Sequence, residues 1–206
     1  MKKLPIYKAV VNFEDNTGIE VLSFVPFPAT ESSFIAFDKD KEFIKFSVDN
    51  EEQRMVRGLV MEADAPIYRR SGDIEYYIVF DKQTLKTMAE KWLMGFQNNF
   101  DENHNFNLVD GVQMQQVYIK DVENGINPKG FEDVNDGSLF CTAHINNDDV
   151  WNAIKDGTFT GFSLAGAFEV AEVKEGESFN DEEVDEDFSA CMQLIEQLQN
   201  KIKNAK

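Results

Sequence analysis

The sequence is poor in cysteine and arginine, and each scarcity argues against a class of site or partner. Among 206 residues there are two cysteines, Cys141 and Cys191, too few for a disulfide framework or a zinc site. Only four arginines occur, without any basic-aromatic stripe: Arg54, Arg57, Arg69 and Arg70. The net charge of −18, from 38 acidic and 20 basic residues, would repel nucleic acid and anionic membranes. We therefore expect no nucleic-acid or membrane partner.

Long apolar runs and cofactor motifs are also lacking. No apolar run approaches the ~20 residues that span a bilayer, and residues 1–8 carry charge without an apolar h-region. We therefore expect no secretory signal and an intracellular location. A hydrophobic content of 42% with 12% aromatic residues nevertheless favours a folded domain with its own core.

One short run resembles a calcium loop but lacks its most specific positions. Asp101, Asn103 and Asn105 have the alternating spacing, but Phe106 stands where glycine is needed and Val112 where a bidentate glutamate is needed. No H-E-x-x-H motif, P-loop or dinucleotide fingerprint occurs. We expect neither a metal nor a cofactor.

Hydrophobic periodicity predicts an α+β fold in which strands predominate. Leu85 to Phe96 has the spacing of an amphipathic helix with Asp81 as its N-cap, and Asn147 caps a short helix that runs through Ile154. Residues 6–63 are predicted to be mostly strand, with candidate runs at 21–25, 34–37, 43–46 and 55–61. Further apolar and β-branched runs predict strands at 74–80, 112–119, 139–145 and 160–170.

A change of composition divides the chain into three parts. Residues 1–171 form the expected folded body. Residues 172–187 hold nine acids and one lysine, which predicts a solvated linker. Residues 188–206 have apolar side chains at heptad spacing, typical of a short amphipathic helix that packs on the body or pairs with another chain.

Three side chains are candidates for chemistry. His104 follows the amphipathic helix in an Asn-rich segment, where it is either a surface histidine or a general base. His144 lies in a predicted strand and fits a partly exposed strand residue. Ser163 stands among small residues in Gly161-Phe162-Ser163-Leu164-Ala165-Gly166, which leaves room for an acyl group, although the frame is not a nucleophile elbow.

Residues 54–170 resemble the serine protease domain of phage prohead proteases, in particular the subgroup of Gram-positive phages and defective prophages. The matching stretches are 56–61, 77–80 with the following helix, Asn103-His104, Val150-Trp151-x-x-Ile154-Lys155-x-Gly157 and Gly161-Phe162-Ser163. The resemblance implies the herpesvirus-assemblin type of fold, a mixed and mainly antiparallel β-barrel with a few surrounding helices.

The resemblance also implies roles. Ser163 would be the nucleophile and His104 its base, 59 residues earlier as in that clan. In many relatives an acidic residue opens a strand after the serine. Here the similar pattern runs from Glu20 to Ala29, which implies a circularly permuted chain in which Glu20 orients His104. His144 is the rival third member, because herpesvirus proteases use a second histidine.

Herpesvirus proteases use an arginine after the nucleophile, but no arginine follows Ser163 here. The expected oxyanion donors are therefore backbone N–H groups near Gly166 and Ala167, or a side chain from elsewhere. The function implied is a serine endopeptidase that processes scaffold and major capsid proteins inside the assembling prohead, in the host cytoplasm, with possible self-association. The alternatives are an inactive protein of protease fold that serves in virion assembly, and a scaffold-like factor organised by the C-terminal helix.

Overall fold

The protein is a mixed α+β structure in the computed structural model, which describes residues 4–28, 46–50, 53–95 and 98–173. The strands are β1 (Ile6–Val10), β2 (Gly18–Val25), β3 (Phe46–Asn50), β4 (Met55–Met61), β5 (Ile67–Ser71), β6 (Ile74–Val79), β7 (Phe100–Glu102), β8 (Val112–Ile119), β9 (Leu139–Ile145), β10 (Gly161–Ala167) and β11 (Glu169–Glu172). The helices are α1 (Lys82–Met94) and α2 (Asp148–Lys155).

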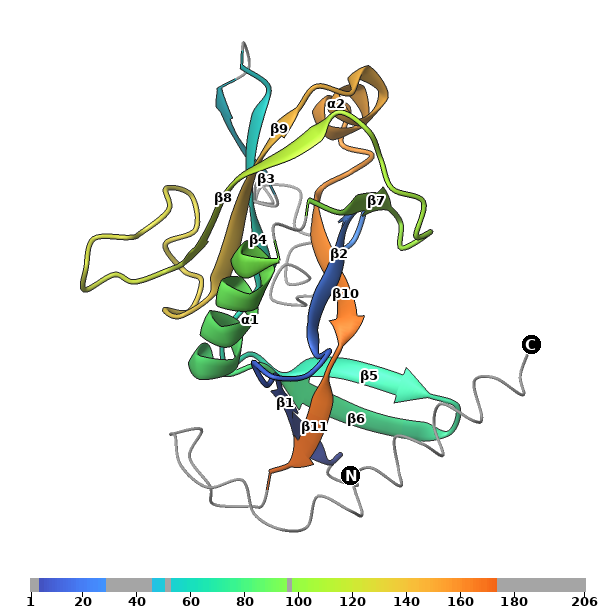
Figure 1. The fold of residues 1–206 in the computed structure, drawn as a ribbon, viewed down its shortest axis with the longest axis vertical. Coiled ribbons are helices and arrows are strands. Elements are labelled where there is room, and N and C mark those ends of the chain that lie inside the picture. The colour runs from blue at the N-terminus through green and yellow to red at the C-terminus, as the bar shows by residue number, and fades with distance from the viewer. Residues whose placement is uncertain (1–3, 29–45, 51–52, 96–97, 174–206) are drawn as a thin grey trace.

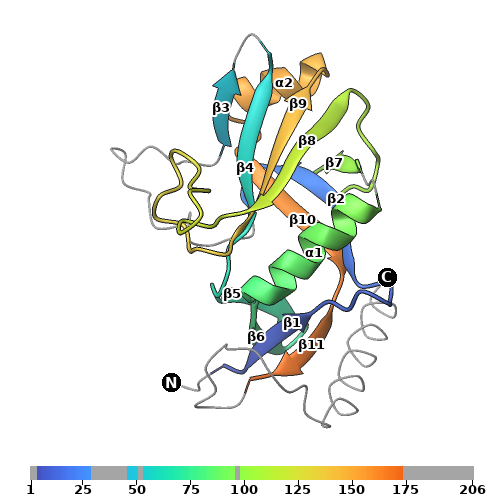
Figure 2. The same cartoon turned by 60° about the vertical axis from the view of Figure 1, so that its left-hand side comes forward.

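The strands form three sheets with the orders β11-β1-β6-β5, β10-β2-β7 and β3-β4-β9-β8. Figures 1 and 2 show the β10-β2-β7 sheet between the other two. Most neighbours are antiparallel, but β1 pairs with β6, and β2 with β7, in parallel. Helix α1 packs against β8, β2 and β9.

Two chain segments run side by side through two of the sheets. The N-terminal segment supplies β1 and β2, and the segment after α2 supplies β10 and β11, with β10 antiparallel to β2 and β11 antiparallel to β1. Where they pass from one sheet to the other, the register shifts between Ala165 and Gly166. A Cβ atom at Gly166 would clash with the Gly18 carbonyl oxygen, so this crossing requires glycine.

Both predicted helix caps are confirmed. The Asp81 Oδ1 accepts the Thr84 N–H at 2.7 Å at the start of α1. The Asn147 Oδ1 accepts the N–H groups of Asp149 and Val150, both at 3.0 Å, at the start of α2. Most of the apolar face of α1 is buried as its periodicity predicted, with Leu85 and Met88 at 0% exposure, but Leu93 is 51% exposed.

The central sheet presents phenylalanine on its core face. Phe24 of β2 lies 5.7 Å from Phe100 of β7 and 5.5 Å from Phe162 of β10, measured between ring centroids. All three rings are essentially buried. Because side chains alternate along a strand, the residues next to these phenylalanines face the opposite side of the sheet.

The structure agrees with the α+β prediction and differs in detail. The described residues form open sheets and no closed barrel. The strand predicted at 160–170 is two strands in different sheets, and β5 and β7 were not predicted because they are short and polar. Glu172, expected in the linker, belongs to β11. The strand predicted at 34–37, most of that at 43–46, residues 174–187 of the linker and the C-terminal helix lie outside the described residues.

Candidate active site

Three polar side chains form a row across the central sheet. Ser163 of β10 lies opposite Ser23 of β2, and Ser23 lies opposite Asp101 of β7. The row lies on the face away from the buried phenylalanines, because it occupies the alternate positions of the same strands. Ser23 and Asp101 are 0% exposed and Ser163 is 5% exposed. Polar groups buried to this degree require partners.

His104 reaches this row from a tight turn after β7. Asn103 and His104 both have left-handed backbone conformations, with φ of 53° and 56°. The turn is fixed at both sides: the Asn103 N–H donates to the Phe24 carbonyl at 3.0 Å, and the Phe106 N–H donates to the Asp101 Oδ2 at 2.7 Å. Non-glycine residues in this conformation are uncommon and tend to occur at functional sites.

The imidazole of His104 bridges the two serines. Its Nε2 lies 2.9 Å from the Ser163 Oγ, and its Nδ1 lies 2.7 Å from the Ser23 Oγ. A neutral imidazole has one N–H donor and one acceptor nitrogen. If Nε2 accepts a hydrogen bond from the Ser163 hydroxyl, the imidazole proton is on Nδ1, and Nδ1–H donates a hydrogen bond to the Ser23 Oγ. Ser23 is therefore placed to accept from Nδ1–H in the tautomer in which Nε2 can act as a base.

The structure brings Ser163 and His104 together but not Glu20, the predicted third member. Glu20 is exposed and lies where the β2–β10 register skips one residue of β2, between Val21 and Ile19. It stands three residues from Ser23, about 10 Å along an extended strand. No hydrogen bond joins its carboxylate to His104 within the described part of the chain. Glu20 therefore lies away from His104, and the His104 Nδ1 meets the Ser23 hydroxyl where a carboxylate was expected.

The other two predicted contributors also lie elsewhere. His144, the rival third member, is in β9, between Met55 of β4 and Gln113 of β8 in another sheet. Gly166 and Ala167 pair with Ile19 and Gly18 in the ladder, about 10 Å or more along β10 from Ser163. Their N–H groups are too distant to stabilise an oxyanion at the Ser163 hydroxyl.

Ser23 is the site residue that sequence reasoning missed. It lies inside the segment that had drawn attention to Glu20, as the one hydroxyl in the otherwise apolar run from Val21 to Val25. Ser163 has the same setting, a single hydroxyl in an apolar strand. A buried hydroxyl in each of two strands was the available signal. Its meaning depends on the cross-strand register, which the sequence does not give.

In the segment that resembles a calcium loop, side-chain oxygens accept hydrogen bonds from the segment's own backbone. Asp101 caps the Phe106 N–H, and the Asn105 Oδ1 accepts the Asn107 N–H at 2.8 Å. The second contact is an Asx turn, and both contacts use the carboxylate and amide oxygens locally. Among the residues that the structure describes, no group of three or more His, Cys, Asp or Glu side chains could hold a metal ion. The same residues include no helix long and apolar enough to cross a membrane.

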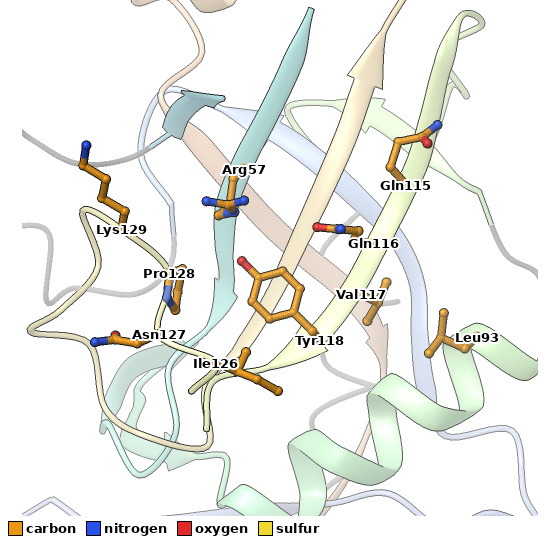
Figure 3. Close-up of a pocket in the computed structure, with 10 residues that line it drawn as sticks. All are labelled: Arg57, Leu93, Gln115, Gln116, Val117, Tyr118, Ile126, Asn127, Pro128 and Lys129. Carbon is orange, nitrogen blue, oxygen red and sulfur yellow. The ribbon is translucent and has the colours of Figure 1, made fainter. Parts of the chain in front are cut away.

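A second surface feature lies away from the two serines. A concavity of about 610 Å³ is bounded by Arg57 of β4, by Gln116 and Tyr118 of β8, and by the segment 126–129. Figure 3 shows these side chains in front of the β4-β9-β8 sheet, with the central sheet passing behind it. Neither serine of the row nor His104 lines this concavity.

Comparison with known proteins finds a distant curated relative. "Phage-like element PBSX protein XkdF" of Bacillus subtilis (strain 168) is 28% identical to this chain over 165 residues. The alignment covers 76% of this chain and 55% of the relative, so the chain spans about half the length of that protein. No solved structure matches.

A protein-family model supplies the broader assignment. It matches residues 42–172, which is more than half of the chain, and the matched region contains both His104 and Ser163. Ser23 lies outside it, on the strand that completes the site. The chain therefore belongs to the family described as "Putative phage serine protease XkdF".

Proposed function

We propose that the protein is a serine endopeptidase in which Ser163 is the nucleophile and His104 the general base. The observation that carries the proposal is the 2.9 Å separation between the Ser163 Oγ and the His104 Nε2. A serine becomes nucleophilic when an adjacent base accepts its proton. The family assignment supports the same class of activity.

The proposed reaction follows the usual two-step acyl transfer. The Ser163 Oγ attacks the scissile carbonyl carbon while its proton moves to the His104 Nε2. His104 then protonates the leaving amine, and the C–N bond breaks to leave an ester on Ser163. Water, deprotonated by the same imidazole, hydrolyses this ester and restores the serine. Ser23 keeps the Nδ1 proton hydrogen-bonded throughout.

The substrates we propose are the scaffold and major capsid proteins of a phage, processed inside the assembling prohead in the host cytoplasm. The support is the family description and the resemblance to prohead proteases. We also propose that residues 174–187 act as an acidic linker and residues 188–206 as a helix that joins the enzyme to scaffold or to a second copy.

We further propose that the fold derives from the assemblin-type barrel by circular permutation. In the usual order the strand with the third site residue follows the nucleophile strand. Here β2 comes first in the chain, pairs antiparallel with β10 and supplies Ser23 to His104. This arrangement supports a circular permutation in which the strand moved to the N-terminal part of the chain but kept its place beside the nucleophile strand.

The alternative is an inactive assembly protein that retains the protease fold. The observation in its favour is that the His104 Nδ1 meets a neutral hydroxyl rather than a carboxylate. Co-expression of the full chain with the scaffold and capsid proteins of its own phage distinguishes the two. We expect processed fragments from the wild type and none from Ser163→Ala, with Ser71→Ala as a control outside the site. Equal processing by wild type and Ser163→Ala would refute the endopeptidase.

A further inference from the structure

We propose that Asp101 is the acid of this site, a positioning residue that acts on His104 through Ser23. The inference rests on the proposed function and deepens it, because it names the group that supplies the missing negative charge. Asp101 does not touch the nucleophile. It occupies the far end of the row in which Ser23 stands between it and Ser163.

The position of Asp101 is the first argument. Paired residues on neighbouring strands lie roughly 4.8 Å apart and project from the same face of the sheet. The pairing of Ser23 with Asp101 in β7 therefore places the carboxylate on the same face of the sheet as the hydroxyl that bonds the His104 Nδ1, although no hydrogen bond joins Ser23 to the Asp101 Oδ1 among the described residues. Asp101 also starts the turn that carries His104, so one side chain adjoins both the imidazole's partner and its backbone.

The state of the two carboxylate oxygens is the second argument. Oδ2 accepts the Phe106 N–H at 2.7 Å and fastens the turn. Oδ1 is buried and has no hydrogen-bond partner within the described residues, although the whole side chain is 0% exposed. A buried acceptor left unpaired is costly, so it calls for a functional explanation. One oxygen holds the turn, and the other remains available to the site.

The chemistry of Ser23 supplies the third argument. When the Ser23 Oγ accepts a hydrogen bond from Nδ1–H, the hydroxyl proton of Ser23 requires an acceptor of its own. Asp101 is the neighbouring acidic group in the row, and its negative charge favours this orientation of the hydroxyl. The same charge stabilises the imidazolium that forms when His104 takes the Ser163 proton. In a buried site such electrostatic support is stronger than in water.

The two roles of Asp101 can be separated by substitution. Asp101→Asn keeps a side-chain oxygen for the Phe106 N–H but removes the charge. Asp101→Ala removes both the charge and the turn contact. Asp110→Asn is the matched control, because Asp110 is an exposed acid a few residues further along the same segment. Thermal unfolding of each full-length variant shows whether the fold is retained.

The first readout is the kinetics of cleavage of a scaffold or capsid substrate. We expect Asp101→Asn to lower kcat by at least ~10-fold, with KM within about twofold of wild type, because the lost charge acts on the transition state. Asp110→Asn should leave both constants unchanged. A kcat of Asp101→Asn within twofold of wild type would overturn the proposal.

The second readout is the tautomer of His104 in the ¹⁵N NMR spectrum, assigned with His144→Gln because the chain has only two histidines. We expect the Nδ1–H tautomer in wild type and a substantial Nε2–H population in Asp101→Asn. An unchanged tautomer would overturn the role of Asp101 whether or not the protein cleaves. Absence of any Ser163-dependent cleavage, with the expected tautomer shift, would instead refute the endopeptidase and leave the positioning role supported.

Discussion

Ser163 and Ser23 lie directly opposite each other on antiparallel strands, and the two nitrogens of the His104 imidazole bond one serine each. One cross-strand pair thus supplies both the nucleophile and the group that orients its base. Since the pair is set by the β2–β10 register, the geometry of the site depends on the pairing of two segments from opposite ends of the folded body.

Ser23→Ala tests whether the second serine matters. It removes the Nδ1 partner and leaves the neutral imidazole free to carry its proton on Nε2, where it cannot accept from Ser163. We expect Ser23→Ala to lower kcat roughly tenfold or more, and Ser163→Ala to lower the cleavage rate to background. The measurement is steady-state cleavage, with Ser71→Ala as the control. Full activity of Ser23→Ala would contradict the assigned tautomer.

Gly166→Ala tests the crossing between the two sheets. The new methyl group would clash with the Gly18 carbonyl, which is backbone and cannot rotate away. We expect a loss of about 1–3 kcal/mol in the free energy of unfolding, measured in urea. Ala167→Ser, at the exposed next position, should change stability by less than about 0.5 kcal/mol. Equal stability of the two variants would argue against the close approach.

Lys120→Met tests the organisation of the segment 121–138. Lys120 is 2% exposed, and its Nζ donates to the carbonyls of Phe131, Glu132 and Val134 at 2.9, 2.9 and 2.7 Å. Methionine fills similar space but leaves these carbonyls without that donor. We expect destabilisation on the order of 3 kcal/mol, measured by urea unfolding. Lys129→Met, at an exposed position, is the control. If Lys120→Met lowers the free energy of unfolding no more than this control does, water replaces the ammonium group as the donor to these carbonyls.

Asp64→Asn should stabilise the protein at neutral pH. Burial, followed by the nearby charge of Asp81, raises the pKa of Asp64 above its usual 3.8. The native state therefore favours the protonated form, and this stabilisation is lost as pH rises above about 3.8. Asparagine tolerates the left-handed backbone at this position, where φ is 57°.

The pH dependence of unfolding checks this prediction. The free energy of unfolding of Asp64→Asn should exceed that of wild type at pH 7, and the difference should shrink as pH falls toward 3.8. Asp73→Asn, at an exposed turn position, is the control. A free energy of unfolding at pH 7 that is lower for Asp64→Asn than for wild type would contradict the inferred direction of the Asp64 pKa shift.

The features that the sequence predicted well are those with local causes. The caps at Asp81 and Asn147 and the buried face of α1 follow from side-chain chemistry within a few residues. The pairing of His104 with Ser163 followed from the resemblance to a known family. Spacing alone left His104 as either a surface residue or a base.

The features that the sequence did not predict depend on register. Glu20 and Ser23 are three residues apart in one strand, and the β2–β10 register places Ser23, not Glu20, opposite Ser163. Asp101 drew attention only as a possible calcium ligand, because β7 is three residues long and pairs with a strand about 80 positions away. Non-local pairing of this kind leaves no periodic signal.

The central claim is that Ser163 is an activated nucleophile, and covalent labelling with a fluorophosphonate tests it most directly. We predict that the full-length protein takes up one label, that mass spectrometry places it on Ser163, and that Ser163→Ala and His104→Gln lose it while remaining folded. Folded wild-type protein that stays unlabelled, or that labels equally well without His104, would contradict the account.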